Sequence, residues 1–113
     1  MPKSDAVRLQ HALDAAHQAI RFTDGMTVEA LRRDERTTMA ALYAITIVGE
    51  ALSQVSPEFR SRRPDVPWRD AIGMRNRLVH GYDEVDYQRV LDTATGDLPR
   101  LCRLSEKALG EMS

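Results

Sequence analysis

The stretch of sequence that decides the fold is DERTTMAALYAITIVGEALSQV, residues 34–55. Apolar residues recur along it at every third or fourth position, which is the spacing of one face of an α-helix. They are Leu42, Ile45, Val48, Leu52 and Val55. A second side of the same helix is also apolar, with Met39, Tyr43, Ile47 and Ala51. Because both sides need to be buried, we expect one to face the protein's own core and the other a partner chain.

Helical spacing also marks the segments on either side of this stretch. Apolar residues at positions 6, 9, 13, 16 and 20 predict a first helix from about residue 5 to residue 22. Thr27 is placed to cap a short helix that ends near Asp34. After the long helix, Ser56 and Pro57 suit the cap and the first position of a short helical turn.

Two more helical regions follow towards the C-terminus. One opens at Pro67 and ends at His80, because Gly81 stands where helices commonly end. The other begins near Asp86, which can cap it, and keeps its apolar stripe in phase through Pro99. We therefore expect a kinked helix, or two nearly continuous helices, in this last region.

Length and composition agree with one helical domain. The chain has 113 residues, of which 42% are apolar, which is enough for one core and too few for two ordinary domains. No segment alternates apolar and polar residues as a half-buried strand does. The prediction is an all-α fold, a bundle of four to five helices that forms one domain over residues 1–113. Because we find neither an apolar run long enough to span a membrane nor a signal peptide, we expect a soluble, cytoplasmic protein.

Charge and cysteine content exclude several classes of protein. The net charge of −1 does not suit a protein whose main task is to coat nucleic acid. Residues 58–77 nevertheless hold six arginines against three acidic residues, a local excess of +3 that either attracts phosphate or is a solvated turn. Cys102 stands alone and is expected to be a small buried residue, so it supports neither a disulfide nor a multi-cysteine metal site. We expect no metal and no cofactor.

Polar residues gather towards the end of the helix that opens at Pro67. Arg75 lies at the edge of the apolar stripe, so its guanidinium needs an anion, a carbonyl or a partner surface. In a helix, Asn76 and His80 share a face, whereas Arg75 and His80 lie about 140° apart. Arg75 and His80 can therefore meet if the helix loosens at its end, if Arg75 reaches round, or if a second chain supplies one of them.

These residue types suit the cleavage of RNA without a metal. Histidine can transfer protons near neutral pH, and arginine offers a planar fork to a charged phosphate. Asn76 could hold the imidazole or the substrate. A structural explanation remains open, because a histidine before a glycine often caps helix carbonyls, and an arginine beside an apolar stripe often pairs with a carboxylate.

The segment RNRLVHGY, residues 75–82, resembles the Arg-x4-His-x-Tyr motif of the HepT-like branch of the HEPN superfamily. The members of this branch are small helical proteins that act as ribonuclease toxins. Further segments resemble the family pattern in the same order, and the likeness covers about residues 5–109. These segments are IVGEAL at 47–52, PW at 67–68, VD at 85–86 and DLP at 97–99.

The resemblance implies that Arg75 and His80 are the catalytic pair, with Asn76 as the polar residue beside the arginine. It also implies that a partner antitoxin, a minimal nucleotidyltransferase, silences the toxin by attaching AMP to Tyr82. Without the resemblance, Tyr82 is an ordinary tyrosine that covers the end of the bundle. The family fold is a homodimer in which the two motifs meet in a cleft. Glu50 matches the Gly-Glu pair of the family and either braces the motif arginine or is a surface carboxylate.

Three functions follow as alternatives. The first is a metal-independent endoribonuclease toxin that cuts its RNA substrate by attack of the 2′-hydroxyl and leaves a 2′,3′-cyclic phosphate. The second is a non-catalytic module that holds a nucleotide or docks a nucleotidyltransferase, and the third is a purely structural helical dimer. The intact set of Arg75, Asn76 and His80 favours the first, because a binding module needs the arginine but no titratable histidine.

Overall fold

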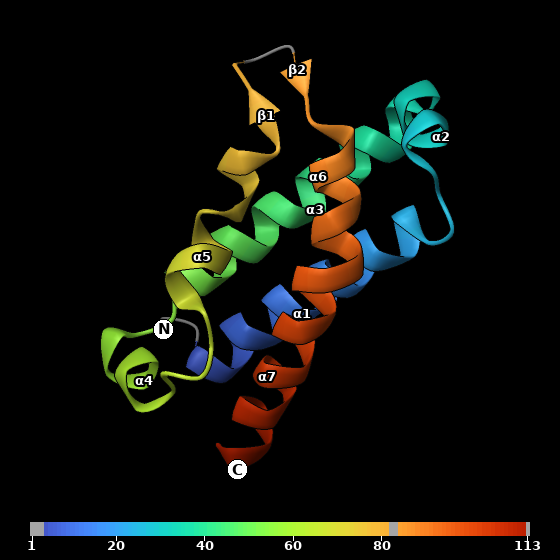
Figure 1. The fold of residues 1–113 in the computed structure, drawn as a ribbon. Coiled ribbons are helices and arrows are strands. Elements are labelled where there is room, and N and C mark those ends of the chain that lie inside the picture. The colour runs from blue at the N-terminus through green and yellow to red at the C-terminus, as the bar shows by residue number, and fades with distance from the viewer. Residues whose placement is uncertain (1–3, 82–83, 113) are drawn as a thin grey trace.

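Two long antiparallel helices form the base of the fold. The structure is a computed structural model that describes residues 4–81 and 84–112. Figure 1 shows α1 (Asp5–Thr23) lying along α3 (Glu35–Ser53), with the short α2 (Val28–Arg33) between them in the chain. Many of the buried side chains of α1 are small, which lets the two helices approach closely. They include Ala12, Ala15, Ala16 and Ala19.

Side-chain caps set where several helices begin, as the sequence predicts. The Thr27 hydroxyl accepts a hydrogen bond of 3.1 Å from the Ala30 N–H at the start of α2. The Ser56 hydroxyl accepts one of 3.2 Å from the Phe59 N–H at the start of α4 (Pro57–Arg62). These bonds satisfy backbone donors that have no partner inside the helix, so local polar residues fix the helix boundaries.

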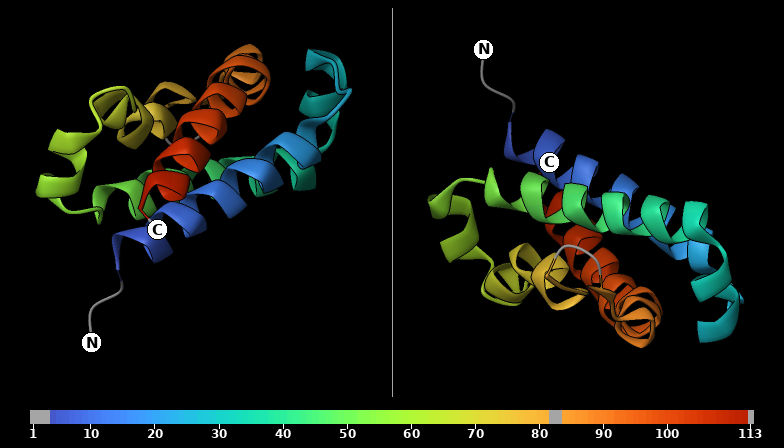
Figure 2. Two further views of the ribbon diagram at one scale, coloured as in Figure 1. Left: turned by 90° about the horizontal axis from the view of Figure 1, so that it is seen from below. Right: turned by 90° about the horizontal axis from the view of Figure 1, so that it is seen from above.

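Residues 87–111, near the C-terminus, form one continuous helical rod across the two long helices (Figures 1 and 2). It consists of α6 (Tyr87–Asp92), the π-helical turn η2 (Thr93–Asp97) and α7 (Leu98–Glu111). Pro99 has no backbone N–H to donate to the carbonyl four residues before it, and the wider turn lies just before this proline. The prediction of nearly continuous helices through Pro99 is therefore confirmed.

A small aromatic cluster holds α4 to Trp68, the first residue of the next helix. The rings of Phe59 and Trp68 meet edge to face, with 6.2 Å between their centroids. The indole N–H of Trp68 donates a hydrogen bond of 3.0 Å to the Arg63 carbonyl. Trp68 is buried, so it anchors α5 (Trp68–Ile72) to the core.

The segment from Pro67 to His80 is not the single helix that we expected. α5 ends at Gly73, and η1 (Met74–Arg77) is one turn of 3-10 helix. Glycine is a poor residue for continuing a helix, and the tighter turn after it accompanies the burial of Leu78, which is 0% exposed. The apolar spacing predicts one long helix, because this pattern does not distinguish a long α-helix from a shorter helix followed by a 3-10 turn.

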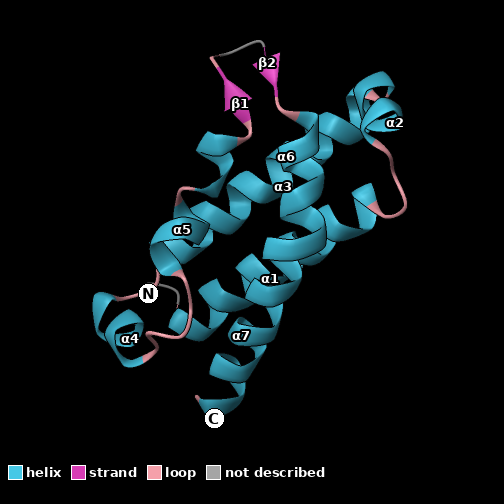
Figure 3. Ribbon diagram, in the orientation of Figure 1, coloured by secondary structure: helices cyan, strands magenta, loops and turns pink. Residues whose placement is uncertain are grey.

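A small two-stranded sheet follows, where no strand was expected (Figure 3). β1 (Val79–His80) pairs antiparallel with β2 (Glu84–Val85), and Val79 lies opposite Val85. Valine favours extended backbone, and Gly81 adopts a φ of 72°, which suits a turn. Strands of two residues are too short to give an alternating pattern, which is why this sheet escaped prediction.

With this sheet as the exception, the prediction of an all-α fold is confirmed. No helix within residues 4–81 and 84–112 is both long enough and apolar enough to cross a membrane. Cys102 is buried, as expected. The second apolar side of α3 is uncovered only in part: Met39 is 61% exposed and Tyr43 is 69% exposed, whereas Ile47 and Ala51 pack partly against the chain's own core. The homodimer remains a prediction.

Candidate active site

Gly49 brings α3 into close contact with the end of α5. A Cβ atom placed on Gly49 would lie 2.8 Å from the carbonyl oxygen of Ile72, closer than real side chains come. The absence of a side chain therefore lets the two backbones approach. Since η1 starts two residues after Ile72, this contact fixes the position of the turn that carries Arg75 and Asn76.

Arg75 and Asn76 line a pocket of about 330 Å³ between α3 and η1, here called the arginine pocket. Its other lining residues are Thr46, Gly49, Glu50, Ser53 and Ile72. The side chains of Arg75 and Asn76 are exposed, and neither makes a hydrogen bond or an ion pair with any residue that the structure describes. Two polar side chains with no structural partner are thus available to a ligand.

Glu50 shares the arginine pocket but is not bonded to the motif arginine. The lining of the pocket places its carboxylate on the same hollow as Arg75. No ion pair joins the two within the described part of the chain. The bracing role of Glu50 therefore stays a prediction.

His80 lies on β1 and faces a different hollow. This hollow of about 460 Å³, here called the histidine pocket, is also lined by Arg32, Asp86 and Tyr87. Nε2 of His80 is 3.8 Å from Oδ2 of Asp86, and the imidazole is 64% exposed. The Asp86 carboxylate thus lies beside the imidazole, at a distance longer than a hydrogen bond. Sequence reasoning recognised Asp86 only as the cap of α6, a role that it also has by accepting from the Arg89 N–H.

A single chain does not place Arg75 and His80 on the same hollow. The α-helix does end before His80, with Gly73 as its C-cap. Even so, Arg75 lines a pocket with residues of α3, whereas His80 lines a pocket with residues of α2 and α6. Arg75 also does not reach round to His80, since the arginine pocket and the histidine pocket share no lining residue. Tyr82, the expected modification site, lies outside the described residues.

Several of the six arginines in residues 58–77 make hydrogen bonds or ion pairs within the protein. Arg60 donates to the Val55 carbonyl, and Arg63 pairs with Asp65. Arg77 donates to the main-chain carbonyl of Asp70. The high arginine content is therefore partly structural.

The arrangement contains the groups that phosphodiester cleavage requires. A histidine near a carboxylate can exchange protons with an RNA hydroxyl, and an unpaired guanidinium can neutralise a phosphorane. The helical fold and the Arg-x4-His pair define a class of protein, the small all-α ribonucleases. The model of the family described as Ribonuclease HepT-like matches residues 12–108, and the chain belongs to this family.

Curated relatives agree with this family. A protein of Thermococcus cleftensis, named provisionally as the ribonuclease HepT, is 31% identical over 107 residues, which are 95% of this chain and 97% of the relative. A provisionally named RNase of Caldanaerobacter subterraneus subsp. tengcongensis is 32% identical over 93 residues, 82% of this chain and 83% of the relative. Another from Methanocaldococcus jannaschii is 29% identical over 113 residues, 99% of this chain and 93% of the relative. No solved structure gives a significant match. The family that the motif suggested is confirmed, and with it the enzyme class.

Proposed function

We propose that this chain is a metal-independent endoribonuclease toxin that acts on cytoplasmic RNA, with Arg75, Asn76 and His80 as its catalytic residues. One observation carries the proposal: Arg75 and Asn76 are exposed in one pocket, and their side chains have no partner among the described residues. In a folded protein, an arginine without a carboxylate or carbonyl partner is well placed to bind an anion. Membership of a ribonuclease family supports the RNA backbone as that anion.

The chemistry assigns one role to each residue. A base removes the proton from the 2′-hydroxyl, the 2′-oxygen attacks the phosphorus, and the bond to the 5′-oxygen breaks as that oxygen takes up a proton. The products are a 2′,3′-cyclic phosphate and a 5′-hydroxyl. His80 serves in the proton transfers, Arg75 stabilises the charge on the phosphorane, and Asn76 positions the phosphate or the imidazole.

The site is completed by a second copy of the chain. Within one chain Arg75 and His80 face different hollows, so one chain alone does not present them to the same phosphate. The exposed apolar side chains Met39 and Tyr43 on α3, the helix that also lines the arginine pocket, offer a surface for the partner. A two-fold dimer would then carry two sites, each with Arg75 from one chain and His80 from the other.

Single substitutions test the catalytic roles. We expect His80→Ala and Arg75→Ala to remain folded and to lose RNA cleavage, the latter by about 2–4 kcal/mol in the activation barrier. His17→Ala and Arg69→Ala are matched controls, since both residues are exposed and line none of the pockets described above. EDTA should leave the wild-type rate unchanged. Full cleavage by folded His80→Ala protein would refute the catalytic role of His80, whereas a folded wild-type protein that binds RNA without cutting it would favour the non-catalytic module.

Mixed dimers test the composite site. Equal amounts of Arg75→Ala and His80→Ala protein, unfolded and refolded together, should give heterodimers with one intact site, and about a quarter of the wild-type activity should return. If each chain carried its own complete site, mixing would restore nothing. The product of the restored reaction should carry the 2′,3′-cyclic phosphate.

The partner that controls the toxin is a minimal nucleotidyltransferase, which attaches AMP to Tyr82. A bulky anion two residues beyond His80 would repel an approaching phosphate and occupy its space. Co-expression with a nucleotidyltransferase encoded by the neighbouring gene should add one adenylyl group to the wild-type protein and none to Tyr82→Phe. Modification of Tyr82→Phe to the same extent would refute this form of control.

A further inference from the structure

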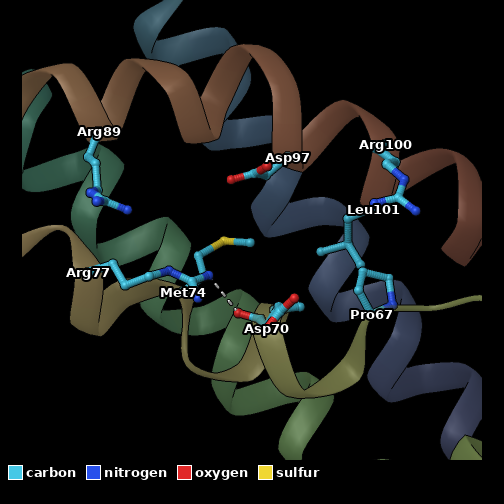
Figure 4. A pocket seen from close by; sticks show the side chains of 9 residues that line it. Pro67, Asp70, Met74, Arg77, Arg89, Asp97, Arg100 and Leu101 are labelled. Atoms are coloured by element: carbon cyan, nitrogen blue, oxygen red, sulfur yellow. Dashed lines mark hydrogen bonds between the residues drawn. The ribbon is translucent and has the colours of Figure 1, made fainter.

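A third hollow, drawn in Figure 4, shares no lining residue with the arginine pocket or the histidine pocket. It has a volume of about 330 Å³ and lies between the α5–η1 segment and the C-terminal rod, so we call it the rod pocket. Buried apolar side chains form its floor, among them Met74, which is 4% exposed, and Leu101, which is 3% exposed. Exposed charged residues form its rim: Asp70, Arg77, Arg89, Asp97 and Arg100.

The opposite charges on this rim do not neutralise one another. No ion pair joins any of its arginines to Asp70 or Asp97 within the described residues. Arg77 donates instead to the main-chain carbonyl of Asp70, at 3.0 Å. Asp97 stands at the start of α7, but its carboxylate makes no capping hydrogen bond. Arg89 lies 3.8 Å from the Asp86 carboxylate, outside this rim, and Arg77 keeps guanidinium N–H groups beyond the one bonded to Asp70. The carboxylates of Asp70 and Asp97 and the guanidinium of Arg100 have no partner among the described residues, so the rim offers both acceptors and donors to a ligand.

We propose that the rod pocket binds a guanine base of the RNA substrate, an inference that rests on the proposed ribonuclease function. Guanine presents two adjacent donors, N1–H and N2–H, on one edge and two adjacent acceptors, O6 and N7, on the other. A carboxylate such as that of Asp97 matches the first edge, and the fork of Arg77 matches the second. The apolar floor at Met74 and Leu101 packs against the face of the ring.

A chain of hollows links this pocket to His80. The rod pocket shares Arg77, Arg89 and Asp97 with a neighbouring hollow beside α6. That hollow in turn shares Asp86 and Gln88 with the histidine pocket. In Figure 4, Arg77 and Arg89 lie together at one end of the rod pocket, away from Pro67 and Leu101. Arg89, between the base and His80, is placed to contact a phosphate of the connecting strand.

The first test measures binding without catalysis. Guanosine 5′-monophosphate is titrated into protein labelled with ¹³C at the methionine methyl groups, and the methyl resonances are followed by NMR. The His80→Ala variant is titrated in parallel. The Met74 resonance is assigned as the one that is missing in Met74→Leu. We expect this resonance to shift and saturate, at a concentration about tenfold lower than for the adenosine, cytidine or uridine monophosphates. Asp97→Asn should weaken the binding of guanosine monophosphate at least about tenfold. Asp14→Asn, at an exposed residue outside the pocket, should leave this affinity unchanged.

The second test maps cleavage in oligonucleotides that contain a single guanosine. Wild-type protein should cut at a fixed offset from that guanosine, and Asp97→Asn should cut more slowly and lose the offset. If RNA is cut without base preference and Met74 does not respond to guanosine monophosphate, the guanine pocket is wrong and the ribonuclease function stands. If Met74 responds but no RNA is cut, the ribonuclease function fails while the pocket still binds guanine. An equal response to all four nucleotides would refute guanine selectivity.

Discussion

Gly49 is the residue on which the position of Arg75 most depends. In Gly49→Ala the new Cβ would meet the Ile72 carbonyl at 2.8 Å, so α5 and η1 must shift. We expect the free energy of unfolding to fall by about 1–3 kcal/mol and RNA cleavage to fall with it. Gly96→Ala is the matched control, because an added Cβ there has nothing within 4 Å. Urea unfolding measures both variants, and equal stability of the two would show that the close approach does not constrain the site.

Cys102 provides a second prediction at the scale of a residue. Burial, with a further contribution from the nearby charge of Glu106, raises the pKa of its thiol to about 11. The group is therefore protonated at neutral pH, and iodoacetamide should modify it only slowly in the native protein. Mass spectrometry before and after unfolding in urea measures the difference. Rapid modification of the native protein would mean that α7 opens readily.

Among single residues, those with local partners were predictable and those with distant partners were not. Thr27 and Ser56 cap helices through atoms three residues away, so the sequence indicates their roles directly. Arg77 and Asp97 line one pocket although they belong to segments that meet only after folding. One sequence contains no signal for such a meeting, and this is why the rod pocket was missed.

Between elements, Asp5 ties the start of α1 to the start of α4. Burial tends to raise the pKa of Asp5, but hydrogen bonds of 2.7 Å from the Ser56 hydroxyl and 2.9 Å from its N–H leave that pKa below the ordinary 3.8. The stabilisation is therefore present above pH 3.8 and is lost as the pH falls through the lower folded value. Asp5→Asn should lower the free energy of unfolding at neutral pH by about 1 kcal/mol and weaken its dependence on acid. Urea unfolding at pH 7 and pH 3 measures this, and an unchanged acid dependence would contradict it.

The long helices were predictable because each buries a continuous stripe. α1 and α3 pack along their length, so their periodicity is sustained over several turns. The segment from Pro67 to His80 was not predictable in detail, because η1 and β1 are too short for their apolar residues to form a periodic pattern. Its shape is set by contacts such as the bond of 2.8 Å from the Asp86 N–H to the Leu78 carbonyl.

At the scale of the whole molecule, the exposed side of α3 predicts the assembly. Met39 and Tyr43 are 61% and 69% exposed, which is unusual for neighbouring large apolar side chains on one helix. We expect light scattering to give the mass of a dimer at micromolar concentration. Met39→Lys combined with Tyr43→Glu should give a folded monomer without RNA cleavage. A wild-type monomer with full activity would exclude the composite site.

The sequence could indicate this assembly but could not describe it. The two apolar sides of the long helix predict a second copy, and the separation of Arg75 from His80 agrees with that prediction. The register between two copies depends on surfaces that no local pattern encodes, so the geometry of the shared site follows neither from the sequence nor from one chain.

The π-helical turn within the C-terminal rod has a consequence for the evolution of this protein. A π turn corresponds to one residue inserted into a regular helix. If residues 93–97 formed a regular α-helix instead, which turns by about 100° per residue, α6 would rotate against α7 by roughly the turn of one residue. Arg89 and Asp86 would then turn away from the hollows that they line. Descendants that keep the site should therefore inherit the wider turn together with the spacing from Asp86 to Leu101, while the length of their loops varies freely.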